Sequence, residues 1–168
     1  RSSAASDVYK RQKTPREPWQ YGDMALKEVK KWINFRHRLV PYLYHTACQT
    51  HQSGIPMIRP LVMEYPKDPI AKIQNLSYML GDALLISPGF DRDEYELYLP
   101  EGRWQDIESK EVYEGMTFVH IENKAFADGG TSLRVFQKEG TSIPLFAQKE
   151  VLHVPAQLWN CLLYTSDA

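Results

Sequence analysis

Cysteine is scarce in this sequence, which holds only Cys48 and Cys161 among its 168 residues. Two cysteines do not provide the framework of a disulfide-rich secreted domain. Long apolar runs are also missing, so the sequence predicts no membrane-spanning helix and no membrane partner. No basic block typical of nucleic-acid binding is present, and a formal net charge of −1 indicates no charged partner. What remains is a globular chain with a length in the range of one domain.

Common catalytic and metal-binding motifs are missing as well. The sequence has no Gly-x-Ser-x-Gly elbow, phosphate loop or dinucleotide fingerprint. His45, Cys48 and His51 suggest a metal site, but on a helix His51 points away from the other two, so we interpret them as ordinary helix residues. The acidic run 91–94 lacks the glycine and the terminal glutamate of a calcium loop, which favours a solvated turn.

The two ends, residues 1–12 and 161–168, show no hydrophobic periodicity. Both resemble in-frame translations of a transposase mosaic-end sequencing adapter, one from each strand. The native part would then run from about Lys13 to Asn160, with Cys48 as its only cysteine, which permits a cytoplasmic location. We expect both tails to pack against nothing. The alternative is a pair of natural disordered termini.

A long amphipathic helix is predicted after the proline-containing loop 13–22. Apolar residues recur there at steps of three and four, at positions 26, 29, 33, 40, 43 and 47. The helix should begin near Asp23 and end near His51, because Gly54 can adopt the left-handed conformation that closes a helix. Pro41 should kink or split it, since proline removes a backbone donor and clashes one turn back.

The next segment, residues 55–63, is apolar except for Pro56, Arg59 and Pro60. This pattern predicts a fully buried parallel strand. Arg59 would need a carboxylate or a carbonyl inside such a strand. It could pair structurally with Glu64, or the two could order an active-site rim; we favour the structural pair. Residues 70–80 then predict a short helix that ends at Gly81.

Short strand patterns fill the rest of the chain. A compact apolar run covers residues 83–87, and residues 128–130 form a strong turn signal. The predicted strands are 95–99, 104–107, 111–113, 117–121, 133–137, 142–146 and 151–154. Short strands at this spacing favour a β-sandwich, with the boundary to the helical part near residues 81–88.

Several ordered motifs resemble the late catalytic-domain signature of glycoside hydrolase family 31, which contains α-glucosidases and α-xylosidases. They are REPW (16–19), RHRLVPYLY (36–44), GIPMIRPL (54–61), EYP (64–66), YMLGDALLISP (78–88) and YLPEGRW (98–104). The resemblance implies the end of a (β/α)8 barrel over residues 13–82, followed by an incomplete antiparallel β-sandwich over residues 83–160. The adapter-like tails 1–12 and 161–168 flank these parts.

The resemblance also implies a function. The chain would be a fragment of a retaining α-glycosidase that hydrolyses α-linked glucosides or, as an alternative, α-xylosides. Its partner would be an oligosaccharide or glycoside substrate, and no cofactor or metal is expected. In this family the nucleophile and the acid/base are aspartates on earlier barrel strands, and a substrate-binding histidine also lies upstream. No catalytic residue is therefore assigned here, and the fragment alone is expected to be inactive.

Trp19 and Tyr21 are the nearest candidates for substrate contact, because they lie in the loop before the long helix and loops after barrel strands surround the active site. They could touch a sugar or pin the loop to the barrel, and both interpretations stay open. A free-standing carbohydrate-binding β-sandwich is a second class of function. The predicted buried strand argues against it, because that strand needs cover on both faces. A structural or interaction protein is favoured only if both ends are native.

Overall fold

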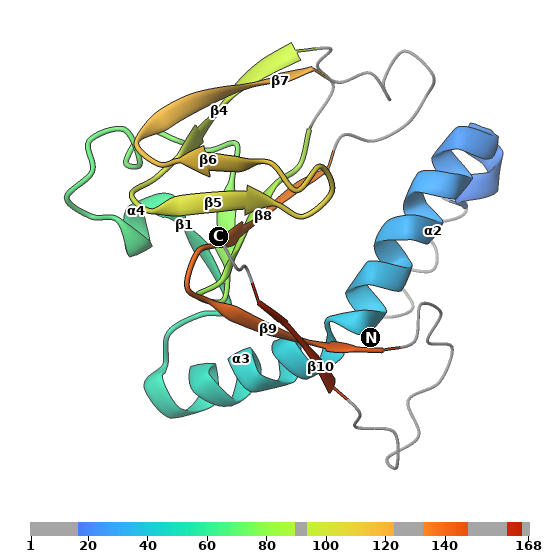
Figure 1. Cartoon of the computed structure of the whole chain (residues 1–168), viewed down its shortest axis with the longest axis horizontal. Helices are drawn as coiled ribbons and strands as arrows, with labels where there is room; N and C mark the ends of the chain where they lie inside the picture. Colours follow the sequence, from blue (N-terminus) through green and yellow to red (C-terminus); the bar gives the residue numbers. More distant parts are fainter. Residues whose placement is uncertain (1–16, 90–93, 123–132, 148–160, 166–168) are drawn as a thin grey trace, which may run out of the picture.

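The computed structural model describes residues 17–89, 94–122 and 133–147, together with the backbone of residues 161–165. The two long helices lie at the right and the bottom of the view in Figure 1, and most of the antiparallel strands lie at the upper left. The helix α2 (Asp23–Arg38) extends away from the sheets, whereas α3 (Val40–Ser53) lies beside the strand β9 (Ser142–Phe146). A short 3-10 helix, η1 (Pro18–Tyr21), precedes α2.

The predicted long helix is split into α2 and α3, and Leu39 separates them. Pro41 stands in the first turn of α3, where its missing N–H leaves no helical hydrogen bond unmade. Gly54 ends α3 in the left-handed region at φ 74°, and its N–H donates to the Thr50 carbonyl at 2.8 Å. Both the break at Pro41 and the stop at Gly54 are therefore confirmed.

The prediction of a buried parallel strand over residues 55–63 is wrong. The strand β1 is only Ile58–Pro60, and it pairs antiparallel with β2 (Tyr78–Leu80) at the edge of a sheet. Ile58 and Pro60 are exposed on either side of the buried Arg59, and the chain continues into the short helix α4 (Leu61–Glu64). Proline cannot donate a hydrogen bond to a neighbouring strand, so it is found on edge strands. The apolar composition of residues 55–63 led to the prediction of a buried strand despite Pro60.

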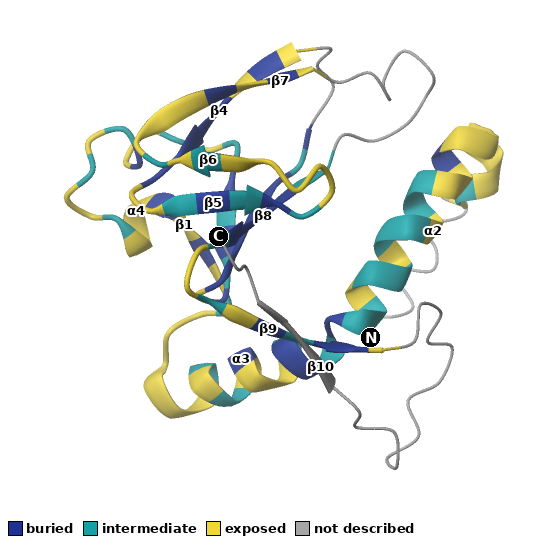
Figure 2. Cartoon of the chain, viewed as in Figure 1, coloured by how far each residue is buried: buried dark blue, intermediate teal, exposed yellow. Residues whose placement is uncertain are grey.

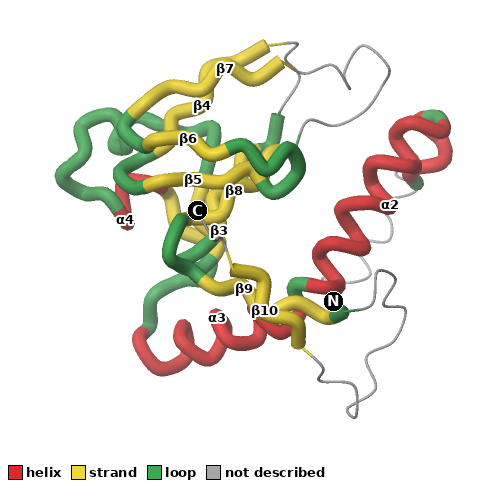
Figure 3. Tube along the Cα trace, viewed as in Figure 1, coloured by secondary structure: helices red, strands yellow, loops and turns green. Residues whose placement is uncertain are grey.

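The short helix predicted over residues 70–80 is also wrong. Turns occupy the segment up to β2, as the loop that leaves α4 shows in Figure 3. The carboxylate of Asp68 accepts the backbone N–H groups of Ile70 and Ala71 at 2.8 and 3.2 Å. This side-chain acceptor holds the backbone in a turn and competes with a helix. Gly81, at φ 61°, then connects β2 to β3.

The remaining strands confirm the predicted antiparallel sandwich. They are β3 (Leu84–Ser87), β4 (Glu94–Leu99), β5 (Arg103–Asp106), β6 (Val112–Glu114), β7 (Thr117–Glu122), β8 (Arg134–Lys138) and β9. One sheet has the order β1-β2-β3-β8-β5-β6, and β4 pairs with β7 in a second. The strand predicted at 151–154 and the turn at 128–130 lie outside the described residues.

Two apolar clusters hold these elements together. The first lies between the six-stranded sheet and the β4–β7 pair and contains the fully buried Leu97, Trp104 and Phe136. The second joins Leu39 and Tyr42 of the helical part to strands β3, β8 and β9. Buried residues gather along these contacts, whereas most of α2 is exposed or half-buried (Figure 2).

The C-terminal tail does not behave as predicted. Residues Cys161–Thr165 form the strand β10, which pairs antiparallel with β9 from Cys161 opposite Phe146 to Thr165 opposite Ser142. An edge strand offers unpaired backbone groups, so a short segment with leucine, tyrosine and threonine can pair with it whatever its origin. Residues 1–12 lie outside the described residues, and the adapter origin of both tails stays a prediction.

Candidate functional site

Trp19 and Tyr21, the two candidates for substrate contact, lie in η1 at the end of α2 that is farthest from the sheets (Figure 1). Their exposed fractions are 64% and 60%. The structure does not place them beside Arg59 or Glu64, which lie at the sheet edge. Neither the sugar contact nor the pinning role is tested by this arrangement, so both stay predictions.

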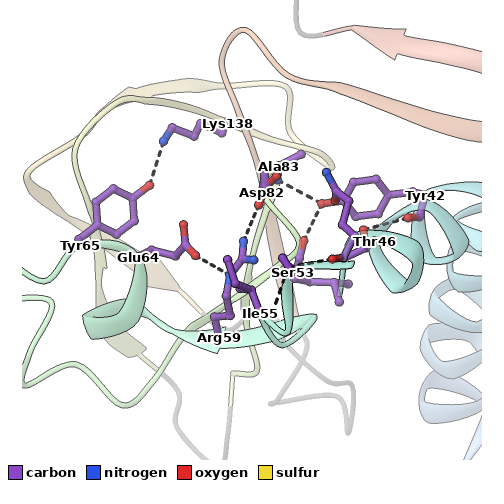
Figure 4. Close-up of polar contacts among 12 residues, drawn as sticks. Tyr42, Thr46, Ser53, Ile55, Arg59, Glu64, Tyr65, Asp82, Ala83 and Lys138 are labelled. Atoms are coloured by element: carbon purple, nitrogen blue, oxygen red, sulfur yellow. Dashed lines mark hydrogen bonds and ion pairs between the residues drawn. The ribbon is translucent and has the colours of Figure 1, made fainter. Parts of the chain in front are cut away.

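Arg59 forms the centre of the best-defined polar cluster. Its Nη2 donates to Oδ1 of Asp82 at 2.6 Å, and its Nε lies 2.5 Å from Oε1 of Glu64 (Figure 4). The second contact lacks the alignment of a hydrogen bond, so we describe it as an ion pair. Arg59 is only 6% exposed, and a guanidinium at this depth requires opposite charge nearby. The predicted structural pair with Glu64 is confirmed.

Sequence reasoning missed Asp82 as the second partner of Arg59. Asp82 follows Gly81 in the turn between β2 and β3, and Arg59 lies opposite Met79 in the β1–β2 ladder. Had residues 78–80 been identified as a strand, the turn that follows them would have been the natural place to seek a carboxylate. The incorrect helix prediction concealed this signal.

Tyr42 ties α3 to the same turn. Its hydroxyl donates to the Leu80 carbonyl at 2.7 Å and accepts the N–H of Ala83 at 3.1 Å. A Cβ atom on Gly81 would overlap this hydroxyl oxygen, so the close approach requires glycine. Gly81 also donates its N–H to the Met57 carbonyl at 2.8 Å. The turn is therefore fixed both by α3 and by the residue that precedes β1.

The buried tyrosines act as hydrogen-bond donors rather than as acids. Burial raises the pKa of Tyr42, although the Ala83 N–H opposes the shift. Burial, assisted by the nearby Asp68 carboxylate, raises the pKa of Tyr98 to about 12. The phenolic oxygen of Tyr98 donates to Oδ2 of Asp68 at 2.6 Å. These hydroxyls stay protonated near neutral pH and hold neighbouring segments together.

Metal ligands do not assemble in the part of the chain that the structure describes. No three histidine, cysteine, aspartate or glutamate side chains gather there in a way that could hold an ion. Cys48 is a free thiol. Residues 91–93 of the acidic run lie outside the described residues, and Glu94 is exposed on β4. None of the helices in the described ranges has the length and apolarity needed to cross a bilayer.

Two family models match the chain in order. Residues 5–46 match the glycosyl hydrolases family 31 TIM-barrel domain, and residues 54–150 match the glycosyl hydrolase family 31 C-terminal domain. The architecture is thus the end of a barrel followed by a β-sandwich domain. The chain belongs to glycoside hydrolase family 31.

Known proteins agree with this assignment. The chain is 32% identical over 153 residues to alpha-glucosidase 2 of Bacillus thermoamyloliquefaciens, covering 90% of this chain and 19% of that protein. It is 33% identical over 132 residues to a 1,6-alpha-glucosyltransferase of Sporosarcina globispora, covering 77% of this chain and 10% of that protein. The chain therefore spans less than a fifth of these relatives.

Two solved structures share the fold. A family 31 dextranase of Flavobacterium johnsoniae in complex with glucose superposes with a TM-score of 0.71 at 31% identity, over 80% of this chain and 16% of that one. A family 31 alpha-xylosidase from a soil metagenome in complex with xylose gives 0.66 at 25% identity, over 76% of this chain and 19% of that one.

The family matches also bear on the organisation of the chain. They leave a gap between residues 46 and 54, whereas the sequence predicted a division near residues 82 and 83. In the structure β1 and β2 belong to the same sheet as β3. The division near residues 82 and 83 stays a prediction. The match to the barrel domain begins at residue 5, inside the segment 1–12 that the sequence set apart as adapter-like.

Proposed function

We propose that the protein to which this chain belongs is a retaining α-glycosidase that hydrolyses α-linked glucosides. The observation that carries this proposal is the order of the two family matches, with the barrel domain first and the C-terminal domain second. Similarity to alpha-glucosidase 2 over 90% of the chain supports glucosides as the substrate class. The substrate is an oligosaccharide or another glycoside.

The chemistry follows from two carboxyl groups. One attacks the anomeric carbon, and the other protonates the leaving oxygen and then activates water; in retaining enzymes the two lie about 5 Å apart. We place neither of them in this chain, nor any substrate-binding residue beyond the candidates Trp19 and Tyr21. No metal or organic cofactor is required, since the carboxyl groups supply both nucleophile and proton.

The role of this chain is structural support of the barrel. Leu26 and Ile33, on the predicted apolar face of α2, are 38% and 46% exposed. Ala25 is the one buried residue of α2. An amphipathic helix normally buries such a face, so we propose that upstream barrel elements cover it in the whole protein. The Tyr42 and Arg59 contacts would then fix the barrel end to the sandwich.

An α-xylosidase is the second candidate, and the similarity to the xylose-bound alpha-xylosidase favours it. A free-standing carbohydrate-binding module is disfavoured for a new reason. The buried parallel strand that argued against it does not exist, but the match to the barrel domain over residues 5–46 has no place in such a module. We further propose a cytoplasmic location, which the single free cysteine of the described residues permits.

Recovery of the upstream reading frame allows a direct test. The reconstructed protein should release product from an aryl α-glucoside or, in the alternative, from an aryl α-xyloside, and the 168-residue chain should release none from either. Turnover by the purified short chain, free of host enzyme, would show that the catalytic residues were wrongly placed upstream.

A further inference from the structure

A polar pocket of about 330 Å³ lies where the end of α3 meets β1 and the turn between β2 and β3. Residues that matter to its chemistry are Gln49, Thr50, Gln52, Ile55, Arg59 and Asp82. Figure 4 shows Ile55, Arg59 and Asp82 beside the last turn of α3. The volume exceeds that of a single hexose, and junctions between parts of a fold are common places for ligand sites.

The pocket presents hydrogen-bonding groups that the fold itself does not use. Among the described residues, the side-chain amides of Gln49 and Gln52 have no hydrogen-bond partner, and both residues are exposed. Asp82 contacts Arg59 through Oδ1, which leaves its Oδ2 as an acceptor within the described part of the chain. The Arg59 guanidinium is buried and held in a fixed orientation by its two carboxylate partners. This one fixed group, together with the exposed amides and the Asp82 oxygen, offers donors and acceptors that suit a ligand with several hydroxyl groups.

Charge and apolar surface narrow the ligand further. Glu64 and Asp82 already neutralise Arg59, so the pocket offers no unpaired positive charge to an anion. Ile55, which is 46% exposed, adds an apolar wall that can cover the C–H face of a sugar ring. We propose that this pocket binds a neutral sugar of one or two rings. The proposal does not depend on the hydrolytic activity, so either can fail without the other.

Titration of the 168-residue chain with D-glucose and maltose, followed by ¹⁵N–¹H NMR, tests the pocket. We expect saturable shifts at residues 49–59 and 82, with a dissociation constant for glucose of about a few millimolar, which lies within the bound that ligand efficiency sets for so small a ligand. The double variant Gln49→Ala/Gln52→Ala should weaken binding at least tenfold. Both positions are exposed on α3 and alanine is the best helix former, so the fold should persist.

His45→Ala is the matched control, because His45 is exposed on the same helix but does not line the pocket. The affinity of the His45→Ala variant for glucose should equal that of the unmodified chain. The proposal is overturned if no saturable shifts occur, or if the double variant binds as tightly as the control. It is also overturned if glycerol or sulfate binds as tightly as glucose, since the site would then recognise no sugar ring.

Discussion

Single residues explain most of the junction between the helices and the sheets. Arg59 is a buried cation in a three-residue strand, and an arginine within an apolar segment by itself indicates that carboxylates lie nearby. Glu64 was predictable as a partner because it lies five positions after Arg59 in the sequence. Asp82 was not, because its proximity depends on the β1–β2 pairing. Local partners of a buried charge can be found from sequence, whereas distant partners require the correct topology.

Removal of both carboxylates around Arg59 should be costly. The double variant Glu64→Gln/Asp82→Asn leaves a buried guanidinium without compensation, and we expect the free energy of unfolding to fall by about 2 kcal/mol. Partial exposure of both carboxylates keeps the loss below that of a fully buried pair. Urea denaturation measures it. Glu139→Gln, which removes an exposed partner of Arg103, should cost less than about 0.5 kcal/mol; equal losses would contradict this account.

Gly81→Ala tests the close approach of Tyr42. Gly54 has a similar positive φ but open space around it, so Gly54→Ala should cost only the left-handed conformation, about 1 kcal/mol. Gly81→Ala adds a clash with the Tyr42 hydroxyl and should cost about 2 kcal/mol or more. The difference between the two variants should shrink in a Tyr42→Phe background. An unchanged difference would show that the hydroxyl is not the obstacle.

At the scale of elements, the sequence predicted what local rules decide. Pro41 and Gly54 act on their own backbone, so the break and the end of the helix were found. Alternating strands between turns were found for the same reason. The buried strand predicted at residues 55–63 is wrong because Pro60 confines this segment to the edge of a sheet. The helix predicted at residues 70–80 is wrong because Asp68 holds the backbone in a turn. The Tyr42 contacts depend on tertiary packing and had no local signal, whereas Asp82 could be found only once residues 78–80 were identified as a strand.

The contact between β4 and the turn at Asp68 should appear in the pH dependence of stability. The pKa of Tyr98 rises to about 12 in the folded state, against about 10 when unfolded. A raised pKa gives stability that is complete below about pH 10 and is lost as pH rises through about 12. We expect a loss of about 2 kcal/mol over this window, measured by urea denaturation at each pH. Tyr113, whose pKa also rises to about 12, adds its own loss over the same window. Tyr98→Phe should therefore make the decline shallower without abolishing it; an equally steep decline would assign the Tyr98 share to other groups.

At acid pH the stability changes in the opposite direction and falls as the pH is lowered. Burial opposes ionisation of Asp68, but the Tyr98 hydroxyl and the N–H groups of Ala71 and Ile70 outweigh it and lower the pKa of its carboxyl. A lowered pKa gives stability that is present above the unfolded value of about 3.9 and is lost as pH falls through the folded value. Asp68→Asn should therefore reduce the slope of stability below about pH 4, and an unaltered slope would contradict the contact.

At the scale of the whole molecule, the described chain is the end of a barrel joined to a sandwich. An apolar cavity of about 580 Å³ opens between α2 and the sheet, with Trp32, Phe35, Leu80 and Val135 among its lining residues. Ile33 and Ile58 also line it and are 46% and 59% exposed. Exposed apolar surface of this kind supports the proposal that further barrel elements pack here in the whole protein.

The stereochemistry of hydrolysis by the reconstructed full-length protein tests the central proposal most directly. Proton NMR of the anomeric signals, recorded in the first minutes of cleavage of an aryl α-glucoside, identifies the sugar released before mutarotation. A retaining mechanism through two close carboxyl groups predicts that α-glucose appears first and β-glucose follows only by mutarotation. Initial release of β-glucose, or no cleavage of either the α-glucoside or the α-xyloside, would contradict the proposed function.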